Sequence, residues 1–90
     1  MQAEEALQRS GIPYTIVRPG GLKSGPVNEG DGGVVLAPAD ALSSGSINRS
    51  LVADICVESL LIDAAENRIV ECICRQGEPK RPIGELFGSL

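Results

Sequence analysis

Ninety residues make one small domain or part of a larger one. Eight Lys and Arg residues against twelve Asp and Glu residues give a formal net charge of −4, and the only aromatic residues are one Tyr and one Phe. This composition, with no basic run, argues against the stacking platforms and phosphate-tracking grooves of nucleic-acid-binding proteins. No apolar run approaches the roughly 18 residues of a membrane span. Because the chain has no His, it cannot supply a His-based triad, metal site or pH switch.

Residues 2–10 read as the last turns of a helix, beginning at Gln2. Ala3, Ala6 and Leu7 fall on one face by i+3/i+4 spacing. Gly11 occupies the place of the left-handed residue that ends a helix. No signal peptide is visible, because residues 1–5 have neither a basic start nor an apolar middle. Since the sequence opens directly on helix-like residues, we expect a preceding segment to be missing.

Residues 14–17 are predicted to form a strand. The run is β-branched and aromatic throughout and does not alternate with polar residues, which is typical of a parallel strand covered on both faces. Tyr14 is expected to be a core residue with a tethered hydroxyl. Residues 18–21 then stop the strand.

A long, irregular connection is predicted over residues 19–45. It holds seven of the eleven glycines and three of the six prolines, with one short strand expected over 34–37. Long loops in compact domains are usually functional or mobile.

The main helix is predicted to begin with Asn48 or Ser50 as its N-cap and to reach Ile62. Its positions are apolar around most of the girth, which predicts burial on more than one side. The one polar line, Ser50, Asp54 and Glu58, is expected to face solvent.

The remaining elements are a strand over 68–74, a loop over 76–81 and a short helix that Pro82 opens. The order of helices and strands therefore predicts an α/β fold with a parallel sheet. Two or three strands do not make a parallel sheet with both faces covered and both edges protected. We therefore expect the trailing part of a larger sheet.

The cysteines, Cys56, Cys72 and Cys74, are an odd set. An odd number argues against a closed disulfide framework and for a reducing, intracellular compartment. The C-x-C spacing differs from that of zinc modules, and no second pair exists. Because Cys72 and Cys74 would point to the same face of a strand, core packing is the expected role, and no metal site is predicted.

The corner that follows the first strand is the most informative feature. Ligands of open α/β sheets bind beyond the carboxyl ends of the strands. Gly20 and Gly21 lack side chains, so a flat ligand can approach their backbone closely. A tight turn that needs positive φ explains the same two glycines equally well.

Residues 10–22 resemble the S-G-x-x-Y-T-I-[VI]-R-[PA]-G-G-L stretch of atypical short-chain dehydrogenase/reductases of the NmrA-like, NAD(P)-binding type. Residues 45–53 resemble the helix start G-x-I-x-R-x-x-V-A of that family, and residues 3–7, 68–71 and 79–87 resemble further stretches of it. The resemblance covers essentially the whole chain. It is closest to uncharacterised chloroplast members from plants and algae.

The resemblance implies a Rossmann-like, doubly wound parallel sheet. Residues 1–90 would be the C-terminal portion of its single NAD(P)-binding domain, incomplete on its own. The implied cofactor is NAD(P), with NADP the expected form, bound only together with the missing N-terminal half. Arg18 and Arg49 match recurrent family arginines, which either line the pocket or pair with a carboxylate. The implied cofactor-binding residues are Pro19, Gly20, Gly21 and Leu22.

Three parts of the family pattern are missing. Residues 30–33 are glycine-rich but lack a preceding strand and a following helix, so they fail as a phosphate loop. The Tyr-x-x-x-Lys pair of catalytic relatives would lie upstream, since Tyr14 has Arg18 at i+4. Many relatives carry Asp where Leu51 stands, so no role of that carboxylate can be transferred. We therefore predict no catalytic residue and an inactive isolated chain.

The leading hypothesis is a part of an NAD(P)-binding oxidoreductase-like protein that supplies one wall of the nicotinamide and substrate cleft. Its partners would be the dinucleotide and an unidentified small-molecule substrate. A non-catalytic NAD(P) sensor or scaffold is the alternative, and a truncated product without independent activity is the third. The expected location is the chloroplast stroma in a plant or alga, and otherwise the cytoplasm.

Overall fold

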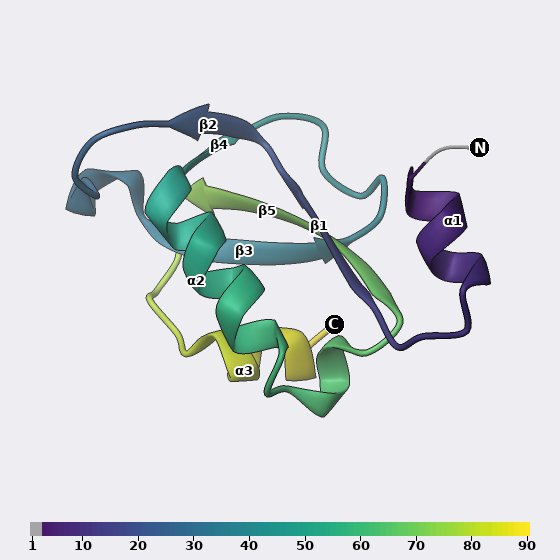
Figure 1. Cartoon of the computed structure of the whole chain (residues 1–90). Helices are drawn as coiled ribbons and strands as arrows, with labels where there is room; N and C mark the ends of the chain where they lie inside the picture. Colours follow the sequence, from purple (N-terminus) through teal and green to yellow (C-terminus); the bar gives the residue numbers. More distant parts are fainter. Residues whose placement is uncertain (1–2) are drawn as a thin grey trace.

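A five-stranded sheet built around one long central strand organises the computed structural model, which describes residues 3–90 (Figure 1). The central strand, β5, pairs in parallel with β1 and antiparallel with β3. It also meets β4, which pairs in parallel with β2. The strands are β1 (Thr15–Pro19), β2 (Gly21–Lys23), β3 (Gly33–Pro38), β4 (Ser46–Asn48) and β5 (Arg68–Arg75).

The sheet confirms the predicted α/β class but is mixed rather than purely parallel. The difference lies in the connection over 19–45, which is more regular than predicted. Its second half returns along β5 as β3, with Val35 opposite Ile73. Its first residues form β2, with Leu22 opposite Ile47. Both strands are specified by pairing with distant residues, which local glycine content does not reveal.

Helix α2 (Arg49–Ser59) packs on one face of the sheet. The Asn48 side chain accepts a hydrogen bond from the Ser50 backbone N–H at 2.9 Å, so Asn48 is the N-cap. The helix ends at Ser59, three residues before the predicted end. Leu60 and Leu61 follow it with 83% and 87% of their surface exposed.

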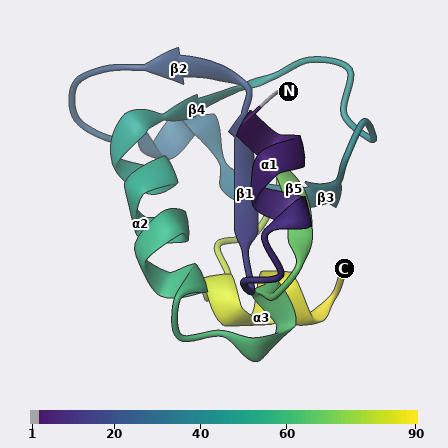
Figure 2. The same cartoon turned by 45° about the vertical axis from the view of Figure 1, so that its right-hand side comes forward.

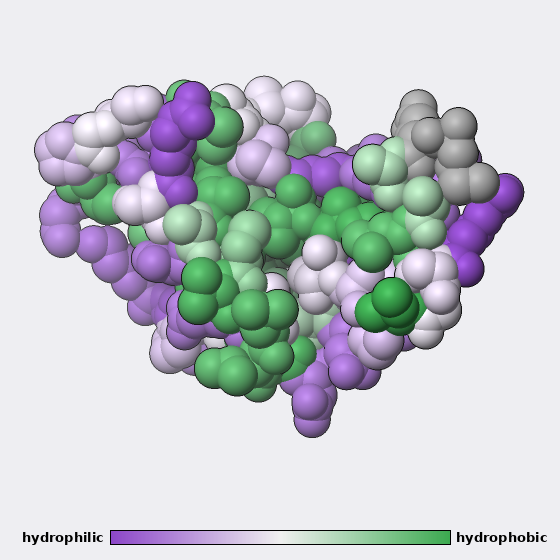
Figure 3. Space-filling view, in the orientation of Figure 1, coloured by the Kyte–Doolittle hydropathy of each residue, from purple (hydrophilic) through white to green (hydrophobic). Residues whose placement is uncertain are grey.

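The prediction that this helix is buried on more than one side is wrong for the described residues. Ile55 is fully buried, whereas Val57 on another face is 64% exposed. Asp54 and Glu58 are exposed, as predicted. Hydrophobic side chains consequently gather on the surface over α2 and the segment after it (Figure 3).

The core lies between the sheet and helices α2 and α3 (Ile83–Gly88). Phe87 supplies the largest buried side chain, and Cys72 is fully buried, as predicted for a small apolar residue. The loop over 76–81 separates β5 from α3 as predicted. The fully or almost fully buried members of the core are Ile47, Ile55, Ala65, Val70, Cys72 and Phe87.

Strand β1 has a single neighbour, β5, among residues 3–90. The predicted parallel pairing is confirmed. The predicted cover on both faces is not present, because residues 15–18 are only half-buried and Pro19 is exposed. Tyr14 lies just before this strand and is half-buried, and its hydroxyl makes no hydrogen bond within the described part of the chain. The prediction that Tyr14 is a core residue with a hydrogen-bonded hydroxyl is therefore wrong.

Helix α1 (Ala3–Arg9) has no buried residue. It ends as predicted, with Gly11 at φ +78°, and lies across β1 from α2 (Figures 1 and 2). The predicted start at Gln2 lies outside the described residues. None of the helices over residues 3–90 is long and apolar enough to cross a lipid bilayer.

Candidate functional site

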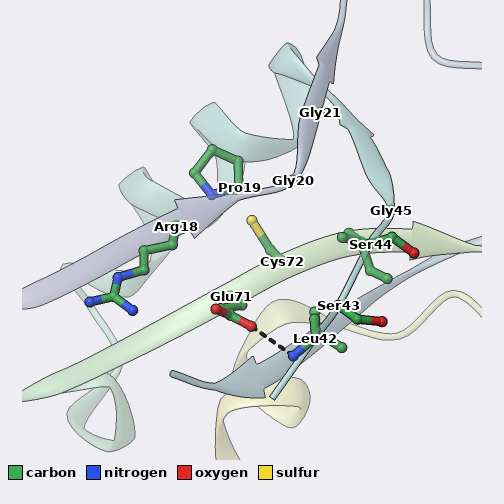
Figure 4. Close-up of a pocket in the computed structure, with 11 residues that line it drawn as sticks. Arg18, Pro19, Gly20, Gly21, Leu42, Ser43, Ser44, Gly45, Glu71 and Cys72 are labelled. Carbon is green, nitrogen blue, oxygen red and sulfur yellow. Dashed lines mark hydrogen bonds between the residues drawn. The ribbon is translucent and has the colours of Figure 1, made fainter. Parts of the chain in front are cut away.

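A cavity of about 310 Å³ lies at the carboxyl end of β1 (Figure 4). Its walls are the corner between β1 and β2, the segment before β4, and the middle of β5. Three of the four predicted cofactor residues line it, namely Pro19, Gly20 and Gly21. Leu22 does not line this cavity and is 45% exposed. The remaining lining residues are Arg18, Leu42, Ser43, Ser44, Gly45, Glu71, Cys72 and Ile73.

Backbone hydrogen bonds hold the corner in place. The Gly20 N–H donates to the Cys72 carbonyl and the Gly21 N–H donates to the Gly45 carbonyl, each at 3.0 Å. Neither Gly20 nor Gly21 has a positive φ, so the interpretation as a turn that needs positive φ is wrong. The requirement for glycine at position 20 has a different cause.

Close packing against the segment before β4 explains Gly20. A Cβ at Gly20 would lie 2.6 Å from the Gly45 carbonyl oxygen, which is shorter than any real contact of this kind. A Cβ at Gly21 would meet its nearest neighbour, the same oxygen, at 3.6 Å, an ordinary distance. Gly45 has φ +143° and lies against Ile73. Gly20 and Gly45 therefore let the two walls converge.

Arg18 lines the cavity and also pairs with carboxylates, so both interpretations of this residue hold. Its Nε and Nη2 donate to the two Glu4 carboxylate oxygens at 3.0 and 2.6 Å, and Nη1 lies 3.4 Å from Asp40 Oδ1. The hydrogen bonds with Arg18 lower the pKa of Glu4 and raise that of Arg18. Arg49 lies elsewhere, donating to the Ser24 hydroxyl at 3.2 Å.

Cys72 is the residue of the cavity lining that carries a thiol, and the pKa of this thiol is strongly shifted. Burial, with a smaller effect of the neighbouring thiols, raises the pKa of Cys72 to about 11. At neutral pH the group is therefore a neutral thiol and a poor nucleophile. Cys56 is exposed and Cys74 is half-buried. No group of three or more potential metal ligands occurs among residues 3–90.

Sequence reasoning missed two parts of this site. The segment 42–45 lies far from the corner in sequence, and its Ser-Ser-Gly run is the only local signal of a turn. Glu71 lies inside a strand, and its position over the cavity follows from its register opposite Arg18. No local pattern indicates that position.

The sequence profile of the NAD(P)H-binding family matches residues 1–63, more than half of the chain. The chain belongs to this family. Over all 90 residues, it is 48% identical to an uncharacterised chloroplastic protein of Arabidopsis thaliana. It is also 42% identical to sanguinarine reductase of Eschscholzia californica, in a match that covers 99% of the present chain. These matches cover 31% and 34% of the two relatives, so the chain spans about a third of the length of these curated relatives.

Among solved structures, the oxidoreductase ylbE from Lactococcus lactis contains a region of similar fold. The TM-score is 0.72 over 98% of this chain and 36% of that protein, at 24% identity. This likeness concerns the fold, and it confirms that the chain forms part of a Rossmann-like sheet.

A further sequence relative is also a chloroplast protein. Pea protein TIC 62, a chloroplastic protein, is 37% identical over 99% of this chain. The family, the fold class and the resemblance to chloroplast proteins are thus confirmed.

Proposed function

We propose that residues 1–90 are the C-terminal portion of a single NAD(P)-binding Rossmann-like domain and form one wall of its nicotinamide and substrate cleft. The cavity at the carboxyl end of β1 carries this proposal, because ligands of open α/β sheets bind at that edge. Pro19, Gly20 and Gly21 would contact the cofactor, with Leu22 at the rim. The whole protein would be oxidoreductase-like.

The lining of the cavity suits a flat and weakly polar ring. The corner presents backbone and no side chain beyond the Pro19 ring, which permits close approach. Ser43 and Ser44 add hydroxyl groups that can donate and accept hydrogen bonds. Ile73 adds an apolar contact. A nicotinamide ring with its carboxamide group has this combination of properties.

The bound cofactor would supply hydride chemistry, and the residues of this chain would orient the ring and exclude water. We propose no proton donor among them. Arg18 keeps its guanidinium proton at neutral pH, and Cys72 is a neutral thiol because its pKa of about 11 lies far above neutral pH. NADP is the proposed form of the cofactor. A plant or algal protein would act in the chloroplast stroma, and any other in the cytoplasm.

Hydrogen exchange in a chimera tests the proposed contact surface. The ninety residues replace the matching region of the Arabidopsis relative, which supplies the rest of a longer protein. NADPH should slow exchange at residues 20–22 and 42–45. The loop at 76–78 lies outside the cavity lining and serves as an internal control. Protection that spares the corner, or appears only elsewhere in these ninety residues, would contradict the proposal.

A non-catalytic sensor is the second candidate. The cavity lining is compatible with it, because neither Arg18 nor Cys72 exchanges a proton near neutral pH. A Tyr-x-x-x-Lys pair in the rest of the protein would favour the oxidoreductase instead. Sanguinarine, the substrate named for one relative, can serve as a hydride acceptor in a test of the chimera with NADPH. Oxidation of NADPH would favour the oxidoreductase. Tight NADPH binding with no oxidation of this or simple quinone acceptors would favour the sensor.

A further inference from the structure

Glu71 makes a two-point polar contact beside the cavity. One carboxylate oxygen, Oε2, accepts a hydrogen bond from the Asp40 backbone N–H at 3.0 Å. The other, Oε1, accepts from the Leu42 backbone N–H at 2.8 Å (Figure 4). Both donors belong to the segment that connects β3 to β4, residues 39–45. Bonds from N–H groups to a carboxylate are charge-assisted and are stronger than neutral ones.

Little else holds the middle of this segment. Its backbone has one bond near each end, from Ala41 to Pro38 at 3.2 Å and from Gly21 to Gly45 at 3.0 Å. Apolar burial contributes little, because most residues from 40 to 45 are exposed. Asp40 has φ +63°, an uncommon conformation for a residue other than glycine. The Glu71 carboxylate is therefore the main contact that selects this conformation.

The segment also has an ion pair, between Asp40 and Arg18, which is weak. Arg18 Nη1 lies 3.4 Å from the Asp40 carboxylate, whose side chain is 90% exposed. Exposed ion pairs of this kind contribute little to stability. The same guanidinium makes both of its shorter bonds with Glu4. Arg18 thus cannot replace Glu71 as the tether of the segment.

We propose that Glu71 is the positioning residue of the cleft. Its carboxylate fixes residues 39–45 so that Leu42, Ser43 and Ser44 face the Pro19–Gly21 corner across the cavity, and the cleft has its binding shape only while both bonds are made. This inference rests on the proposed function in one respect, the identity of the ligand. The tether itself is independent of any ligand.

Amide hydrogen exchange, measured without ligand, tests whether Glu71 holds residues 39–45 in place. Glu71→Gln keeps the size of the side chain but leaves one acceptor oxygen for two N–H groups. Exchange at the Asp40 and Leu42 amides should become about tenfold faster, which corresponds to the loss of a net contribution of about 1.4 kcal/mol. Asp40→Asn removes the contact with Arg18 and keeps the backbone donor. Glu58→Gln changes an exposed carboxylate of α2. Both should change exchange by less than about twofold.

Cofactor affinity in the chimera tests the link to the cleft. Glu71→Gln should weaken NADPH binding at least about fivefold, Glu71→Asp should have an intermediate effect, and Glu58→Gln should have none. Unfolding temperatures of the same variants separate positioning from stability, because a merely structural role would lower the temperature without changing the affinity of the folded protein.

Each outcome decides one part of the proposal. Unchanged exchange at both amides in Glu71→Gln, or in Glu71→Asp if that variant alone folds, would overturn the tether. Faster exchange with unchanged NADPH affinity would overturn the positioning role. A wild-type chimera that does not bind NADPH would contradict the proposed function and the effect on affinity, while the exchange result would still decide the tether.

Discussion

Two adjacent glycines, Gly20 and Gly21, differ in whether their surroundings leave room for a side chain. The missing side chain of Gly20 makes room for the Gly45 carbonyl, whereas the surroundings of Gly21 accept a methyl group. Gly20→Ala should destabilise the fold by about 1–3 kcal/mol through overpacking, and Gly21→Ala by less than about 1 kcal/mol. Urea unfolding of the two variants measures this difference. Equal losses would show that the corner is not packed as described.

Cys72 gives the chain a characteristic response to alkaline pH. Burial raises the pKa of its thiol from 9.0 to about 11. The unfolded chain therefore loses this proton more readily, and the stabilisation present below about pH 9 should be lost as the pH rises through about 11, by about 2–3 kcal/mol. Unfolding free energies across this range, compared with Cys72→Ala, isolate the effect. An identical decline in the variant would assign it to other groups.

At the scale of elements, the sequence predicts what local patterning specifies. The Asn48 cap, the left-handed Gly11 that follows α1 and the apolar strand β5 follow from short-range rules and are confirmed. Strand β2 and the antiparallel pairing of β3 could not be predicted, because they depend on partners more than twenty residues away. Three of the four cofactor candidates that the family resemblance implied line the cavity. The rule that places ligands at the ends of parallel strands points to the same corner, because it requires no knowledge of the opposite wall.

The exposed residues after α2 should contribute little to the stability of this chain. Leu60 and Leu61 are almost entirely exposed, whereas Ile55 is fully buried. Changing both leucines to Gln should alter the free energy of unfolding by less than about 0.5 kcal/mol, while Ile55→Ala should cost about 2–5 kcal/mol. Thermal unfolding and light scattering measure stability and association together. A large loss on changing the leucines would mean that this surface is covered.

Helix α1 should be released from the sheet by acid. Hydrogen bonds from Arg18 lower the pKa of Glu4 below its ordinary value of 4.5. A lowered pKa in the folded state means that the contact stabilises the fold above that ordinary value and is lost as the pH falls through the lowered one. Amide shifts of α1 should therefore move towards coil values in acid, and Glu4→Gln should show this already at neutral pH. Glu5→Gln is the control, and persistence of the α1 shifts in Glu4→Gln would contradict the account.

At the scale of the whole molecule, the edge of β1 and the apolar surface of α2 have in common that residues 3–90 leave both of them uncovered. A half-buried strand with a single neighbour exposes unpaired backbone groups. The uncharacterised Arabidopsis protein and sanguinarine reductase are each about three times as long as the matched region. The pattern of residues 14–17 predicted the strand, and the number of strands predicted an incomplete sheet. The sheet order shows that the open side is at β1.

The isolated chain also tests the possibility of a product without independent activity. A sharp and reversible thermal transition of the purified ninety residues would argue against that possibility. A broad, irreversible transition with aggregation would favour it, because the β1 edge and the leucines after α2 would then associate. Restoring the sharp transition in the chimera would show that these surfaces become covered.

The affinity of NADPH for the ninety residues alone and for the chimera tests the central claim most directly. The claim is that this chain supplies one wall of the cleft and that the helix N-terminus holding the phosphates lies outside these ninety residues. We predict a dissociation constant of about 10 µM or lower for the chimera and above about 1 mM for the ninety residues alone. Micromolar binding by the ninety residues alone would contradict the account.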